Sequence, residues 1–230
     1  MNDAAPPEKP HHTGHRARLR ARFLEAPSAV PDYEILEMML FAANPRGDMK
    51  TEAKRLLGLF GNSFARLLNA DRAALRAAGL TEAQIGPIVL AREAATRLTR
   101  ADLAEKPILS NWQALLDYVQ VAQGEAPVEQ FRVLFLDRKN ALLKDELQQQ
   151  GTIDQTPVFP REVVKRALEL GASALILVHN HPSGDVKPSR ADIEMTKQVR
   201  DAAKALGINL HDHVIVGRGR HASLKSMGLI

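Results

Sequence analysis

Residues 174–184 read Ala-Leu-Ile-Leu-Val-His-Asn-His-Pro-Ser-Gly. The first five form an uninterrupted apolar run, which is typical of a central β-strand buried in a sheet. His179 and His181 follow directly. Because strand side chains alternate with a period of two, both imidazoles are expected on the same side of the sheet. The stretch therefore predicts a sheet with two histidines at the end of a central strand, before a Pro-Ser-Gly turn.

A serine and a carboxylate follow this turn. Ser189 and Asp192 lie three residues apart, in the first turn of a helix predicted to extend to about residue 206, so they are neighbours on one helix face. The strand end and the helix start can converge on one point. Two imidazoles and one carboxylate make a three-ligand set that leaves a fourth position for water, the arrangement expected of a catalytic zinc ion. Water on such a metal reaches a pKa near ~7 and becomes a nucleophile.

The alternative interpretation treats these residues as ordinary surface groups. The histidines would lie in a loop, and Asp192 would be a helix-start acid stabilised by the helix dipole. Their joint spacing after a buried strand favours the metal site. Nearby, His211 and His213 are interpreted as packing or supporting residues rather than ligands. Asn180 is expected to face away from the two histidines and to hold the adjoining loop.

The bulk composition limits the class of protein. The chain has 230 residues, of which 45% are hydrophobic and 25% charged, so it has the length for one or two globular domains. No apolar run approaches the ~18–20 residues needed to cross a membrane. The absence of cysteine excludes disulfides and thiolate zinc sites. No secretory signal is recognisable at the N-terminus, so a cytoplasmic location and no membrane partner are expected.

The periodicity of the apolar residues changes along the chain. We expect a disordered leader at residues 1–14, an all-helical domain at 15–104, and a sheet domain at 107–230. A strand is predicted at 131–136, where apolar residues follow a period of two, and its return strand at about 141–150. The predicted fold is α/β in the broad sense (α+β): a helical N-terminal domain, then a mixed β-sheet flanked by helices.

The helical region carries two features that bear on nucleic-acid binding. The segment Ala78-Gly79-Leu80-Thr81 resembles the turn of a helix-hairpin-helix unit, which presents backbone N–H groups to a phosphate, but its second glycine is missing. A plain packing turn is the alternative. The net charge of +4 is only mildly basic. The nearest basic cluster is interpreted either as a solvated helix or as a phosphate-contacting one; it comprises Arg16, Arg18, Arg20 and Arg22.

The spacing H-x-H-P, then S-x-x-D, resembles the JAMM motif of the JAB/MPN metalloprotease superfamily. Flanking segments are similar to those of its RadC family: Gly151-Thr152-Ile153, Pro160-Arg161-Glu162-Val163, the stretch from His179 to Asp185, Pro188 to Asp192, and Asp212 to Gly217. The resemblance covers residues 107–230. Residues 14–103 resemble the helical N-terminal part of the same family. A JAB/MPN-like fold is therefore implied for the sheet domain.

The resemblance also implies roles for individual residues. One zinc ion per chain would be held by His179, His181 and Asp192. Ser189 would stabilise the oxyanion of a tetrahedral intermediate. A glutamate upstream of the motif would act as the general base. Glu129, at the start of the strand 131–136, is the predicted base, and Glu146 on the return strand is the alternative.

Three functions follow from these observations. The first is a zinc-dependent hydrolase that cleaves an amide, peptide or isopeptide bond with metal-activated water, acting on an unidentified peptide or amide substrate. The second is a DNA-repair or recombination accessory protein that binds DNA weakly through the helical domain, with or without hydrolase activity. The third is a non-catalytic scaffold. The intact ligand set argues against the third, and the first two are compatible with each other.

Overall fold

A computed structural model describes residues 14–44, 48–104, 107–151 and 158–230. The chain divides into two compact units, Met1–Ala91 and Arg92–Ile230. The division falls within helix α6 (Glu82–Ala104), so the end of this helix groups with the second unit. The predicted disordered leader lies outside the described residues except for Gly14, as do Thr152 and Ile153 of the RadC-like segments.

The first unit is helical in all of its regular structure that is described. Besides the start of α6, its elements are α1 (His15–Glu25), η1 (Pro27–Ala29), α2 (Asp32–Leu40), α3 (Lys50–Leu59), α4 (Phe64–Asn69) and α5 (Arg72–Ala77). The short helices begin at side-chain caps: the side chains of Ser63 and Asp71 accept hydrogen bonds from the backbone N–H groups of Arg66 and Ala74. Leucines and isoleucines spaced along α2, α3 and α6 pack into one core.

The second unit contains a mixed five-stranded sheet, which confirms the predicted fold class. Its remaining elements are η2 (Ile108–Ser110), α7 (Trp112–Gln123), β1 (Gln130–Leu136), β2 (Leu142–Gln150), α8 (Pro160–Glu169), β3 (Ala174–Asn180), α9 (Arg190–Lys204), β4 (Asn209–Gly217) and β5 (Arg220–Ser223). The strand order is β2-β1-β3-β4-β5. Strands β3 and β4 are parallel, because α9 carries the chain back between them, and the other pairs are antiparallel.

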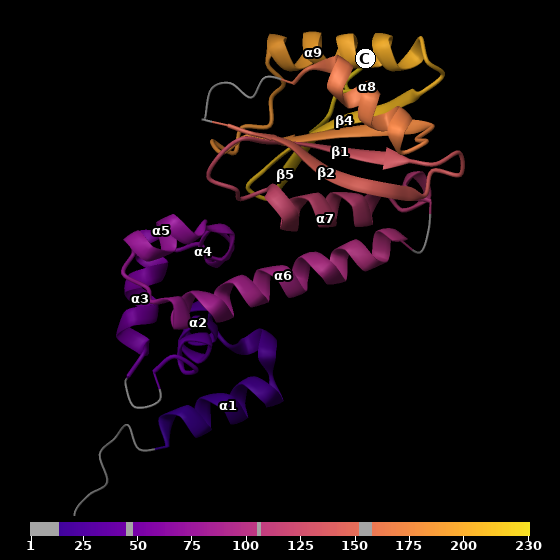
Figure 1. The fold of residues 1–230 in the computed structure, drawn as a ribbon. Coiled ribbons are helices and arrows are strands. Elements are labelled where there is room, and N and C mark those ends of the chain that lie inside the picture. Colours follow the sequence, from indigo (N-terminus) through magenta and orange to yellow (C-terminus); the bar gives the residue numbers. More distant parts are fainter. Residues whose placement is uncertain (1–13, 45–47, 105–106, 152–157) are drawn as a thin grey trace, which may run out of the picture. The chain divides into compact units, whose positions relative to one another are not determined.

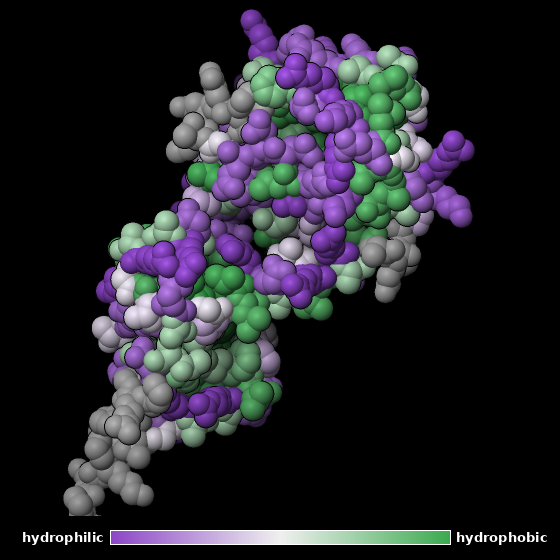
Figure 2. Space-filling view, in the orientation of Figure 1, coloured by the Kyte–Doolittle hydropathy of each residue, from purple (hydrophilic) through white to green (hydrophobic). Residues whose placement is uncertain are grey.

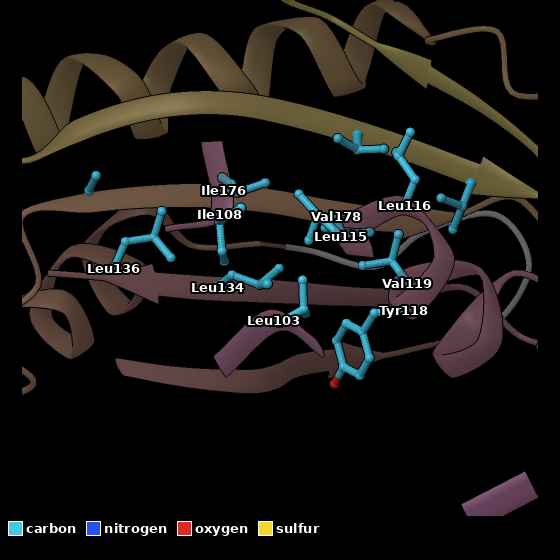
Figure 3. Packing of buried hydrophobic residues seen from close by; sticks show 13 residues of the cluster. Leu103, Ile108, Leu115, Leu116, Tyr118, Val119, Leu134, Leu136, Ile176 and Val178 are labelled. Atoms are coloured by element: carbon cyan, nitrogen blue, oxygen red, sulfur yellow. The ribbon is translucent and has the colours of Figure 1, made fainter. Parts of the chain in front are cut away.

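Helices cover both faces of this sheet. Figure 1 shows α8 and α9 on one side and α7 on the other. The alternation along β3 accounts for the two layers: Ile176 and Val178 face α7, whereas Leu175 and Leu177 face α8 and α9. Figure 3 shows the α7 layer, where side chains from β1, β3 and α7 interlock. All seven residues of β3 are buried, as the apolar run predicted.

Figure 2 shows hydrophilic side chains over much of the surface, with several groups of hydrophobic side chains between them. Apolar atoms contribute much of the surface of any folded protein. Within the described parts of the chain, no helix is long and apolar enough to cross a membrane.

Candidate metal centre

The two histidines of the H-x-H motif lie where the buried strand β3 ends. His179 is the next-to-last residue of β3 and only 1% exposed, while His181 directly follows the strand and is partly exposed. The residues of β3 that precede His179 on its face, Leu175 and Leu177, pack against α8 and α9. His179 therefore faces the same side as α9, which supplies the carboxylate.

Asp192 is held at the start of α9 by a capping box. The Ser189 hydroxyl oxygen accepts a hydrogen bond from the Asp192 backbone N–H, at 3.1 Å, and Asp192 Oδ2 accepts one from the Ser189 backbone N–H, at 2.7 Å. This pair of bonds restricts the rotation of the Asp192 side chain. The S-x-x-D spacing is thus a helix start and a positioning device for the carboxylate at once.

The three side chains, here called the triad, converge tightly. His179 Nε2 lies 2.8 Å from His181 Nε2 and 3.4 Å from Asp192 Oδ1, and His181 Nε2 lies 3.7 Å from Asp192 Oδ2. One ligand atom from each residue falls within 4.8 Å of the others, so the group can hold a metal ion. Zinc bonds of about 2.0–2.1 Å in a tetrahedron separate neighbouring ligand atoms by about 3.3 Å, close to the spacing observed here.

The protonation of His179 also suits a ligand. Burial lowers the pKa of His179 to about 4 from an ordinary 6.5, with Asp192 acting in the opposite sense and His181 adding to the lowering. The imidazole is therefore neutral at pH 7, and a neutral imidazole is the form that binds a metal. His181 Nδ1 lies against the backbone carbonyl of Asp185, which can only accept, so the proton of a neutral His181 is on Nδ1.

Two further residues border the triad. The sequence interpretation named His213 as a packing or supporting residue, and it did not single out Thr196. His213 on β4 is fully buried, and its Nε2 lies 2.7 Å from His179 Nδ1. Thr196 on α9, also fully buried, lies 2.5 Å from His213 Nδ1. Thr196 is four residues after Asp192, so its helical spacing from the carboxylate was the one available signal. His211, by contrast, binds Asn140 Oδ1.

The model of the family described as "RadC-like JAB domain" matches residues 109–229. A relative named "UPF0758 protein" from Rhodobacter capsulatus is 56% identical over 214 residues, which cover 92% of this chain and all of the relative.

The chain belongs to the RadC family. The JAB domain match covers the whole sheet and the triad, so the resemblance stated from the motif is confirmed. The roles assigned to single residues stay predictions.

Asn180, between the two histidines, connects the centre to the residues before β1. Its Oδ1 accepts from the backbone N–H of Gln130 at 2.8 Å, and its Nδ2 donates to the carbonyls of Ala126 and Val128 at 3.3 and 3.1 Å. Asn180 therefore holds the loop on both sides of Glu129. The sequence predicted that Asn180 holds a loop but did not identify this one. The β1–β3 ladder ends where Phe131 pairs with His179, and Glu129 lies two residues before Phe131, immediately before β1.

Glu146, the alternative base, is engaged elsewhere. Glu146 on β2 pairs with Val133 on β1, and Val133 pairs with Leu177 on β3. Strand β1 therefore lies between Glu146 and β3, and Glu146 is level with Leu177 rather than with His179. Arg166 on α8 donates to its carboxylate, with the shortest contact 2.6 Å. The Arg166 guanidinium lowers the pKa of Glu146. Glu146 is thus the partner of a structural arginine on this face of the sheet.

The helical unit contains arginines with intramolecular partners at both predicted DNA-binding features. Arg16 donates to the carbonyl of Asn44 and stacks on Phe41, and Arg22 pairs with the buried Glu34. These contacts attach α1 to residues on and after α2.

The turn between α5 and α6 is similarly occupied. Gly79 takes a positive φ of 93°, and the backbone N–H of Thr81 donates to Gln84 Oε1 at 2.9 Å. Arg72 and Arg76 both bind Glu82 at the start of α6. These contacts hold the turn against the start of α6.

Proposed function

We propose that this chain is a zinc-dependent hydrolase of the JAMM type that cleaves an amide, peptide or isopeptide bond. The observation that carries the proposal is the convergence of two imidazole nitrogens and one carboxylate at the end of β3. A set of two nitrogens and one oxygen leaves a coordination position for water, as catalytic rather than structural zinc sites do. Membership of the RadC-like JAB family supports the same chemistry.

In this mechanism His179, His181 and Asp192 would hold the zinc ion. A bound zinc ion supplies Lewis acidity, which makes water more acidic and a carbonyl carbon more electrophilic. Glu129 takes a proton from the attacking water and delivers it to the nitrogen of the leaving amine. Its place immediately before β1, two residues from the Phe131 that pairs with His179, supports that role.

Ser189 supplies the hydrogen bond to the developing oxyanion. The hydroxyl oxygen accepts from the Asp192 N–H, and this cap does not use the O–H bond itself. The exposed hydroxyl can therefore donate to a substrate oxygen that approaches the triad. Loss of one such donor typically costs about 10²–10³ in turnover.

The test begins with metal content, because the substrate is unidentified. Wild-type protein purified without chelator is expected to carry one zinc per chain, and His179→Gln is expected to carry almost none. His211→Gln is the matched control, since His211 binds Asn140 and not the triad. Zinc-loaded protein is then incubated with a mixture of quenched peptides and isopeptide-linked conjugates, and products are identified by mass spectrometry.

Two outcomes would contradict the proposal. Wild-type protein that binds zinc no more tightly than His179→Gln would remove the metal site. Stoichiometric zinc with no cleavage of any amide in the panel, at any protein concentration, would favour the scaffold alternative instead.

DNA binding by the helical unit stays a prediction from the sequence. The partners of Arg16, Arg22, Arg72 and Arg76 do not favour it. If it occurs, its affinity should fall steeply with salt, and it should weaken when the four arginines of α1 are replaced by alanine.

A further inference from the structure

We propose that Thr196 and His213 are positioning residues that determine which ring nitrogen of His179 carries the proton. Through this arrangement the Nε2 atom of His179 is left with its lone pair facing the other two members of the triad. The inference rests on the proposed zinc site, because it concerns how that site is prepared. It assigns a function to two buried residues that touch no substrate.

The argument starts at the Thr196 hydroxyl, which has a single hydrogen. Thr196 Oγ1 donates that hydrogen to the backbone carbonyl of Asp192, one turn earlier on α9, at 2.5 Å. A carbonyl can only accept, so the direction of this bond is unambiguous. Toward His213 Nδ1, also 2.5 Å away, the same hydroxyl can then only accept. His213 Nδ1 must therefore carry a hydrogen.

The same reasoning continues to His179. His213 is fully buried, which favours a neutral ring with one N–H. With that hydrogen on Nδ1, His213 Nε2 is an acceptor, and His179 Nδ1 at 2.7 Å must donate to it. His179 Nε2 then has a free lone pair. The chain from Thr196 through His213 thus leaves one tautomer for His179.

The result is a close pair of acceptor atoms. The Asp185 carbonyl likewise leaves a lone pair on His181 Nε2. The two Nε2 atoms face each other at 2.8 Å, beside the Asp192 carboxylate. Three electron-rich groups 2.8–3.7 Å apart repel one another unless a cation lies among them. The hydrogen bonds outside the triad therefore prepare it for a metal ion before the ion arrives.

A purely structural role for Thr196 explains only one of its two hydrogen bonds. Threonine in a helix often bonds the carbonyl one turn earlier, which satisfies its hydroxyl without any further function. That role explains the contact with Asp192 but not the contact with His213. It also predicts that Thr196 can change without any effect on the imidazoles of β3 and β4.

The first experiment measures tautomers in metal-free protein by ¹⁵N NMR of the histidine rings, at a pH above 7. In wild type, His213 is expected with its proton on Nδ1. Thr196→Val keeps the shape of the side chain but removes the hydroxyl, so the proton of His213 is expected to move to Nε2. Thr196→Ser keeps the hydroxyl and should retain the wild-type tautomer. Thr96→Val is the matched control, because Thr96 also bonds the carbonyl one turn earlier, in α6.

The second experiment measures zinc affinity by competition with a chelator. Affinity is expected to fall about 10–100-fold in Thr196→Val, as for other groups that orient metal ligands. It should stay near the wild-type value in Thr196→Ser and Thr96→Val. A wild-type His213 that carries its proton on Nε2, or a Thr196→Val variant with unchanged tautomer and unchanged zinc affinity, would overturn the inference.

The two proposals can fail separately. If wild-type protein binds no zinc, the proposed hydrolase fails, yet the NMR experiment still shows whether Thr196 controls the ring of His213. If wild-type protein binds zinc but the tautomer of His213 is unchanged in Thr196→Val, only the positioning role is lost.

Discussion

The helical unit and the sheet unit each gather ionisable side chains, and the two groups differ in how charge is balanced. In the helical unit, Arg72 and Arg76 share the carboxylate of Glu82 on the surface. Opposite charges satisfy each other there, and exposed pairs of this kind contribute little to stability. In the triad of the sheet unit, each atom with a free lone pair lies beside other atoms with free lone pairs, and no positive charge lies among them in the metal-free protein. That imbalance, rather than the number of charged residues, marks a binding site.

The two candidate bases differ in the same way, because Glu146 is paired with an arginine. Replacing the predicted base, Glu129, has the largest expected effect. Replacing Glu129 by glutamine should lower turnover about 10²–10⁴-fold, because a positioned general base contributes that much. Zinc content should be unchanged. Glu146→Gln is the matched control, expected near wild-type turnover, since its partner is Arg166. Kinetics on any substrate found in the panel decide the matter, and a larger loss in Glu146→Gln would exchange the roles.

The hydrogen bonds between Asn180 and the residues around Glu129 give a second test of the difference between buried and exposed polar groups. Asn180→Ala leaves the N–H of Gln130 and two carbonyls without a buried partner, so the free energy of unfolding should fall by about 2–3 kcal/mol. Urea unfolding measures this loss. Asn69→Ala removes one exposed hydrogen bond and should change stability by less than about 0.5 kcal/mol. Equal effects in both variants would mean that Asn180 does not hold the loop.

Metal-free protein should lose stability as the pH falls below about 6.5. His179 titrates near pH 4 when folded, because burial disfavours its charged form, and near 6.5 when unfolded. Between these values the unfolded chain binds the extra proton, so the free energy of unfolding rises with pH, by up to about 1.4 kcal/mol per pH unit for this group. Burial lowers the pKa of His213 as well, which adds in the same direction. Above about pH 6.5 neither group contributes.

Urea unfolding from pH 5 to 8 measures this slope. His179→Gln removes one of the titrating rings. The slope of the variant should therefore be smaller by up to about 1.4 kcal/mol per pH unit, which corresponds to one proton. A slope identical to that of wild type would show that His179 is protonated in the folded chain.

The smallest expected effect lies in the helical unit. Arg22→Gln breaks the pair with Glu34 and should lower the free energy of unfolding by no more than about 1 kcal/mol, because the arginine is largely exposed. Arg20→Gln, on the exposed part of the same helix, is the control and should be close to neutral. A loss of several kcal/mol in Arg22→Gln would mean that the buried Glu34 carboxylate depends on Arg22 to balance its charge.

The sequence predicted those parts of the fold and site that depend on local spacing. A period of two predicted β1, an uninterrupted apolar run predicted β3, and the S-x-x-D pattern marked the start of α9. The same local rules put His179 and His181 on one side and Asn180 on the other. Each of these inferences spans only a few residues, over which backbone geometry alone determines direction.

Only the tertiary structure decided which distant residues meet the triad. His213 reaches His179 because β3 and β4 pair in parallel at one register, and Thr196 reaches His213 because α9 packs on that face. Arg166 engages Glu146 for the same kind of reason, across α8 and β2. Local periodicity determines the face on which a side chain lies, but not the register of the neighbouring strand. Hydrogen-bond partners, and with them the tautomer of a buried histidine, follow from that register.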